Sequence, residues 1–132
     1  MATRNNLIET ISLYPKAAST AFAFGGFVMS NGSGEITPLT PTNPVFGLGL
    51  QTVTSADTDY AAETEIPVDV VNKTVDRFLI EVTGTATSEM VGLPFDISAG
   101  SASVVDVGSA GTQFRLERFI SATLCEFSVL LS

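Results

Sequence analysis

The sequence is poor in the residues that build most metal and catalytic sites. Its 132 residues include no histidine, no tryptophan and a single cysteine, Cys125. Without histidine, neither a Ser-His-Asp triad nor a zinc site of the usual Cys/His type can form. One cysteine excludes an intrachain disulfide. Cys125 lies in the apolar run ATLCEFSVLL, and we interpret it as a small buried hydrophobic residue.

Charge is scarce as well. Charged residues make up 15% of the chain, well below the ~25% usual for soluble domains, whereas 45% of the residues are hydrophobic. This composition disfavours disorder. A surface with so few charges must be covered by small polar residues or by other subunits, so we interpret the composition as favouring assembly. The net charge of −8 repels phosphate backbones and disfavours nucleic-acid binding.

Long apolar runs are missing too. No stretch approaches the ~18 apolar residues that a membrane-spanning helix needs, so we expect no membrane partner. The first twenty residues also lack the continuous apolar region of a secretory signal peptide. We therefore expect synthesis in the cytoplasm. The two N-glycosylation patterns, at Asn31 and Asn72, are interpreted as coincidental.

What the sequence does contain is the pattern of short β-strands. Alternation places Phe78, Ile80 and Val82 on one face of a strand and Arg77, Leu79, Glu81 and Thr83 on the other, and Asn31-Gly32 is a strong hairpin-turn signal. Three prolines within residues 37–44 exclude a helix or a central strand there. Strands are expected within residues 21–29, 45–53, 65–71, 76–87, 89–97, 102–107, 114–120 and 122–132. About eight short strands predict an all-β fold, a single-domain β-sandwich or β-barrel.

The first 19 residues are expected to differ from the β domain of residues 20–132. Leu7, Ile8 and Ile11 have helix-like spacing, and Pro15 would end such a helix. We therefore expect residues 1–19 to form a short helix or an extended arm. Leu7, Ile8, Ile11 and Tyr14 are the candidate interface residues of this segment.

The stretch TSADTDYAAETEIPVDV, residues 54–70, is the strongest candidate for a site. It carries five carboxylates and no basic residue. Asp57 and Asp59 have the i, i+2 spacing of calcium loops, which makes Asp57, Asp59 and Glu63 candidate calcium ligands. However, Ala62 stands where the EF-hand pattern requires glycine. We favour a solvated loop that leads into a strand and expect no bound metal.

Beyond this loop, alternation predicts the two faces of the next strand. Ile66, Val68 and Val70 should face inward, whereas Glu65 and Asp69 should face the solvent. Charges on the outer face of a strand can also protect a sheet edge from unwanted pairing. Two of the five acids in this stretch are thereby explained without a ligand.

Catalytic motifs are absent from the sequence. Paired carboxylates can hydrolyse glycosides, but fourteen acids place some pair close together by chance. The chain has no G-x-S-x-G elbow, and its glycine-rich turns lack the lysine of a phosphate loop. We therefore expect a protein that is not an enzyme and carries no cofactor.

The order of segments resembles a known class of structural proteins. The strand AFAFGGFVM is followed by a turn and a proline-rich segment, then by VFGLGL, the acidic turn SADTDYAAETE and the strand IPVDVV. Over residues 20–131 this order resembles the small head-decoration, or cement, proteins of tailed bacteriophages. The resemblance implies a virion protein that binds the outside of the head shell and stabilises it. It also implies a homotrimer, with the major capsid protein as partner.

A second class stays open beside this one. A receptor- or carbohydrate-binding β-sandwich of a virion or cell surface, with or without supporting calcium, would need exposed aromatic residues or a cation-binding loop near Tyr60. Calcium binding through Asp57 and Asp59 would favour this alternative over a decoration protein.

Overall fold

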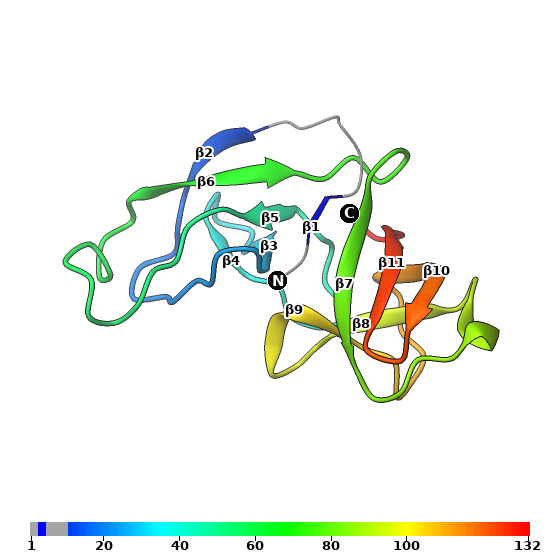
Figure 1. Ribbon diagram of the computed structural model, residues 1–132. Helices are drawn as coiled ribbons and strands as arrows, with labels where there is room; N and C mark the ends of the chain where they lie inside the picture. Colours follow the sequence, from blue (N-terminus) through cyan, green and yellow to red (C-terminus); the bar gives the residue numbers. More distant parts are fainter. Residues whose placement is uncertain (1–2, 5–10) are drawn as a thin grey trace.

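The chain forms two β-sheets that pack together, as seen in a computed structural model that describes residues 3–4 and 11–132 (Figure 1). The six-stranded sheet contains β1 (Thr3–Arg4), β7 (Arg77–Thr83), β8 (Pro94–Ser98), β9 (Ser101–Asp106), β10 (Phe114–Ser121) and β11 (Leu124–Val129). The five-stranded sheet contains β2 (Ile11–Pro15), β3 (Phe27–Ser30), β4 (Ile36–Pro38), β5 (Gly47–Gly49) and β6 (Glu65–Val70). One short 3-10 helix, η1 (Ser88–Met90), is the only helix in these residues. The all-β prediction is confirmed, with three more strands than the expected eight: β1, β2 and β4.

Five strands of the first sheet close into a small barrel. Its strand order is β7-β11-β10-β8-β9, and β9 returns to pair in parallel with β7. The predicted grouping of Phe78, Ile80 and Val82 on one face of β7 is confirmed, and all three are buried. A closed ring leaves few free edges, which protects this half of the molecule from unwanted strand pairing.

The second sheet, with strand order β2-β6-β5-β3-β4, also curls toward closure. Just beyond β2, Lys16 forms a parallel bridge with Ile36 of β4, and the Ala17 N–H donates to the Ile36 carbonyl oxygen at 3.0 Å. This curl encloses a small separate core. Its buried members are Phe22, Val28, Ile36, Val53, Ile66 and Val68.

Phe27 connects the two sheets. This β3 residue is fully buried. Its ring centroid lies 5.2 Å from that of Phe78, in an edge-to-face contact, and 5.0 Å from that of Phe114. Phe78 and Phe114 belong to the barrel, so one side chain of the second sheet reaches the main core. Because both sheets contribute to this core, the chain forms a single domain.

A buried amide makes a second connection. Gln113 lies just before β10 and has no exposed surface. Its Nε2 donates to the carbonyl oxygens of Thr40 and Asn43 at 2.8 and 2.7 Å, and its Oε1 accepts from the Ile97 N–H at 2.8 Å. Thr40 and Asn43 lie in the proline-rich segment, which is thereby held against the barrel.

The turn signals of the sequence correspond to turns in the structure. The β3–β4 hairpin pairs Ser30 with Ile36, and Gly32 in its loop has a φ of 84°. Gly47 meets a different requirement, because a Cβ there would lie 2.5 Å from Cγ1 of Val68. Glycine is therefore needed for β5 and β6 to approach each other this closely.

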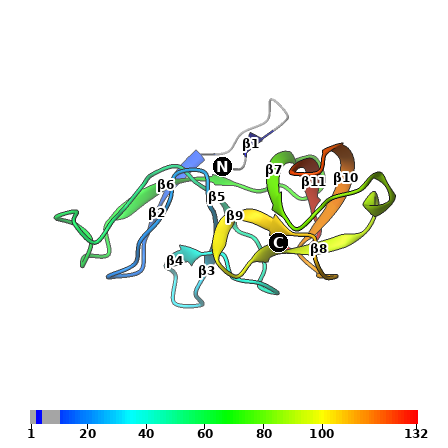
Figure 2. The same cartoon turned by 60° about the horizontal axis from the view of Figure 1, so that its bottom comes forward.

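The described part of the predicted N-terminal segment belongs to the second sheet. Ile11, which ends the helix-like spacing, begins β2, and all five residues of β2 pair with β6. Leu7 and Ile8 lie outside the described residues. Figures 1 and 2 both place β2 and β6 on the side of the molecule away from β10 and β11. Among the described residues, then, β2 does not form an arm separate from the β domain.

Candidate functional site

The acidic loop of residues 54–64 folds around a buried lysine. Lys16 has no exposed surface, and its Nζ donates to the carbonyl oxygens of Tyr60 and Ala62 at 2.9 and 2.5 Å. The Lys16 backbone N–H donates to the Thr64 carbonyl oxygen at 2.9 Å. A buried ammonium needs such partners to offset the loss of its hydration. The loop is therefore held in place by Lys16. It lies at the end of the molecule farthest from the barrel (Figures 1 and 2).

Sequence reasoning missed this lysine. Lys16 directly follows Pro15 in a stretch with no helical or strand alternation that would mark position 16 as buried. The one available signal is that Lys16 is the last cation before an acid-rich loop, and sequence order does not reveal proximity. The contact depends on the β2–β6 pairing, which brings the ends of both strands together.

The three candidate calcium ligands are engaged separately. The carboxylate of Asp57 accepts from the Thr54 N–H at 2.7 Å, and that of Asp59 accepts from the Thr64 hydroxyl at 3.2 Å. Both are local bonds that fix the loop. In the part of the chain that the structure describes, no group of three or more His, Cys, Asp or Glu residues could hold a metal ion. Asp57, Asp59 and Glu63 therefore do not converge on one point.

Glu63 faces another carboxyl group instead. A hydrogen bond with Glu35, together with the negative charge of Glu35, raises the pKa of Glu63. The pKa of Glu35 is lowered, chiefly by the Asn31 amide, which donates to its carboxylate at 3.0 Å, and also by the bond with Glu63. The β3–β4 hairpin loop thus touches the acidic loop through two acids.

The prediction that Asp69 faces the solvent is wrong. Its exposed fraction is 4%, although Ile66 and Val68 are buried and Glu65 is exposed, as predicted. Alternation assigns two faces to a strand but does not reveal whether both are covered. β6 lies between β2 and β5, where Asp69 is in register with Leu48 of the main core. Asp69 is buried because it shares its face of the sheet with Leu48, and that face lies toward the main core.

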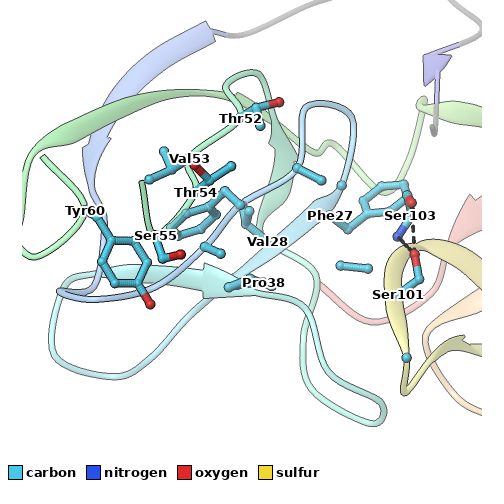
Figure 3. Close-up of a pocket in the computed structure, with 16 residues that line it drawn as sticks. Phe27, Val28, Pro38, Thr52, Val53, Thr54, Ser55, Tyr60, Ser101 and Ser103 are labelled. Atoms are coloured by element: carbon cyan, nitrogen blue, oxygen red, sulfur yellow. Dashed lines mark hydrogen bonds between the residues drawn. The ribbon is translucent and has the colours of Figure 1, made fainter. Parts of the chain in front are cut away.

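A hollow of about 710 Å³ lies between the two sheets (Figure 3). Figure 3 shows Tyr60 and Val53 on one side, Ser101 and Ser103 of β9 on the other, and Phe27 between them. Its lining residues offer hydroxyl groups but no carboxylate, amide or cationic side chain. The hydroxyls of Ser101 and Ser103 bond to each other at 3.1 Å. Of the side chains that commonly act as general acids or bases, its lining contains Tyr60 alone.

Several large apolar side chains are left exposed. On β2, the exposed fractions of Ile11 and Leu13 are 54% and 60%, although Tyr14 packs edge-to-face on Phe46 with 4.8 Å between the ring centroids. The barrel exposes a second set: Val91, Leu93, Phe119 and Ile120. Of the four predicted interface residues, Ile11 is exposed, Tyr14 is half-buried, and Leu7 and Ile8 lie outside the described residues.

Cys125 is buried on β11, as predicted. Burial raises the pKa of its thiol, although the bonds to the backbone at Ile120 and Ser121 act in the opposite direction. A thiol with a raised pKa carries little thiolate, which is the reactive form. Cys125 is therefore a packing residue of the barrel.

No protein-family model matches the chain, and no curated protein matches it. Within residues 3–4 and 11–132, no helix is long and apolar enough to cross a membrane.

Proposed function

We propose that the chain is a structural virion protein that decorates the outside of a bacteriophage head shell and stabilises it. The observation that carries this proposal is the contrast between the buried polar side chains and the exposed apolar ones. The buried polar side chains Lys16 and Gln113 hold loops in place, whereas large apolar side chains on β2 and on the barrel are left exposed. Such an arrangement suits a protein that works through its surfaces. The order of segments along residues 20–131 supports the same class.

The stabilising mechanism follows from mass action. A protein that binds the assembled lattice better than its free subunits shifts the equilibrium toward the lattice. The net charge of −8 suits a position on the outer surface, away from the packaged DNA. The partners in this proposal are the major capsid protein and further copies of the chain, arranged as a homotrimer. No catalytic step, cofactor or metal takes part.

Cosedimentation with empty heads tests this proposal. Expanded heads are assembled from the major capsid protein that is encoded nearest to this chain in its genome, and the purified chain is added at increasing concentration. The proposal predicts saturable binding at a fixed number of copies per head. Unexpanded heads are the control for lattice recognition. Absence of binding to expanded heads at saturating concentration would overturn it.

One observation favours a function of another class. The hollow beside Tyr60, which combines an apolar lining with several hydroxyl groups, would suit a receptor- or carbohydrate-binding β-sandwich. Calorimetry with calcium and with a panel of oligosaccharides tests this alternative. Binding that is lost in Tyr60→Ala, by a chain that does not bind heads, would favour it over decoration. Calcium binding that is lost in Asp57→Asn would also favour it.

A further inference from the structure

The outer edge of β2 offers backbone groups for pairing. Pro67 has no N–H, and its carbonyl oxygen accepts from Leu50 N–H, on the β5 side, at 3.0 Å. Leu13 lies opposite Pro67, so the backbone groups of Leu13 point away from β6. The Ala17 N–H confirms this alternation, because it bonds to Ile36 on that same outer side. The N–H and C=O groups of Ile11 and Leu13 therefore lie along the outer edge.

This edge lacks the features that normally prevent pairing. Natural sheet edges are protected by charged side chains, prolines, bulges or a covering segment. Residues Ile11 to Tyr14 include no charge, no proline and no bulge. Within residues 3–4 and 11–132, the edge is covered only near its end, where Lys16 and Ala17 meet β4. Ile11 and Leu13 also expose more than half of their surfaces here.

We infer that β2 pairs in antiparallel fashion with β2 of a second copy of this chain, about a two-fold axis at Ser12. In this register Ile11 lies opposite Leu13 of the other copy, and the reverse pair repeats across the axis. Because all four residues point their backbone groups outward, each opposed pair forms two hydrogen bonds. The two exposed apolar side chains of each copy are then paired across the strands and lose much of their exposure.

The neighbouring registers are worse. An axis at Leu13 would place Ile11 opposite Pro15, which has no N–H to donate. An axis at Ile11 would centre the paired segment on Ile11, so that Leu13, the more exposed of the two apolar residues, would lie away from the centre. Of these three registers, only the one centred on Ser12 places Ile11 of each copy opposite Leu13 of the other.

Charge does not oppose a second copy at this position. Two chains of net charge −8 repel each other over most of their surfaces. The strand at this axis is uncharged, and of the two acids on the adjacent strand β6, Asp69 is buried and Glu65 lies at the far end, opposite Pro15. Among the described residues, exposed like charges thus lie away from the axis.

This contact goes beyond decoration and does not depend on it. The axis is two-fold, so the contact differs from the three-fold contact of the proposed trimer, and it would join copies that belong to different trimers. An isologous contact of this kind is self-complementary and closed. Its four backbone bonds and two apolar pairs form a small interface, so we expect a weak association that strengthens with concentration.

A cysteine scan of the isolated protein tests the register. At an antiparallel pair without direct hydrogen bonds, the Cα atoms lie about 4.5 Å apart, which is within the range that a disulfide spans. Ser12→Cys meets its own copy in this way. Two Leu13→Cys residues would lie about 8 Å apart, too far for a disulfide. Ser33→Cys, in the exposed β3–β4 loop, controls for random collision, and Cys125 is buried and stays unchanged.

Under mild oxidation we expect Ser12→Cys to form a disulfide-linked dimer at least tenfold faster than Leu13→Cys or Ser33→Cys. Equal rates for the three variants would overturn the inference, because they would indicate collision alone. Faster linkage of Leu13→Cys would overturn the register.

Sedimentation measurements complete the test without a new disulfide. Leu13→Lys should abolish the concentration-dependent association, whereas Leu93→Lys, which replaces an exposed leucine of the barrel, should leave it unchanged. If the protein shows no association up to high concentration, or if Leu13→Lys instead abolishes only the binding to heads, the edge does not pair with a second copy.

Discussion

The ammonium group of Lys16 donates a hydrogen bond of 2.9 Å to the carbonyl oxygen of Tyr60, 44 positions along the chain. A second bond from the same ammonium reaches Ala62. Lys16 itself is fixed by its bridge to Ile36, so this side chain joins the end of β2, the edge strand β4 and the acidic loop. The loop that resembles a cation site in sequence is thus organised by a cation of the chain itself.

Replacing this lysine should loosen the loop. Lys16→Met keeps the apolar stem but leaves the carbonyl oxygens of Tyr60 and Ala62 without the ammonium. We expect a loss of about 2–4 kcal/mol in the free energy of unfolding, since bonds to charged groups contribute more than neutral ones. Urea denaturation measures the loss. Limited proteolysis should show faster cleavage within residues 54–64, and Lys73→Met, at an exposed position, is the matched control. Unchanged proteolysis in Lys16→Met would contradict this role.

Two phenylalanines three positions apart should respond very differently to truncation. Phe27 is fully buried between the sheets, whereas Phe24 is 51% exposed at a turn. Phe27→Ala should cost about 3–5 kcal/mol of unfolding free energy because it leaves a cavity against Phe78 and Phe114. Phe24→Ala should change the stability by less than about 1 kcal/mol. Similar losses in both variants would show that the sheets do not depend on Phe27.

The amide of Gln113 should be as important as an apolar core residue. Gln113→Leu keeps the size of the side chain but leaves the Thr40 and Asn43 carbonyls and the Ile97 N–H without their partner. At about 1–3 kcal/mol for each unsatisfied buried group, we expect a loss of at least about 3 kcal/mol. Thermal unfolding measures the loss in Gln113→Leu. Gln51→Leu, at a half-buried position, is the control for the effect of a glutamine-to-leucine change as such. A small loss in Gln113→Leu would mean that water or another group satisfies the three atoms.

The contact between Glu35 and Glu63 should make stability depend on pH. The raised pKa of Glu63 means that its contribution to stability is present at low pH and is lost as the pH rises through that raised value. The lowered pKa of Glu35 acts in the opposite direction, with a contribution that is lost as the pH falls. Glu63→Gln removes the repulsion between the two charges. Its melting temperature should therefore exceed that of the unmodified protein more at pH 7 than at pH 4.

Glu89→Gln, at an exposed position on η1, is the control for this pH series. It should give the same difference in melting temperature at both pH values. If Glu63→Gln behaves in the same way, the two carboxyl groups do not interact in solution.

The sequence predicted the strands with clear alternation or clear turns. Phe78, Ile80 and Val82 share one face of β7 as expected, and the Asn31-Gly32 turn lies in a hairpin. These features depend on local geometry alone: side chains alternate along a strand, and glycine adopts a positive φ. Local patterns of this kind can be recognised in the sequence without knowing which strands pair with each other.

The features that depend on strand order were not predicted. Asp69 is buried because it shares a face with Leu48 of the main core. Lys16 is buried where the chain just beyond β2 meets β4 and the acidic loop. β2 itself was expected as a helix or an arm, since Leu7, Ile8 and Ile11 have helix-like spacing and only pairing with β6 reveals the strand. The acidic loop was correctly placed before β6, but nothing local indicates that Asp57 and Asp59 bond within it.

Calorimetry of empty expanded heads, with and without the purified chain, tests the central claim most directly. If the chain is a decoration protein, the temperature at which the shells melt should rise with the amount of chain bound and level off at saturation. The free chain, melted alone, controls for its own unfolding. Shells that bind the chain to saturation and melt at the same temperature as bare shells would contradict the account.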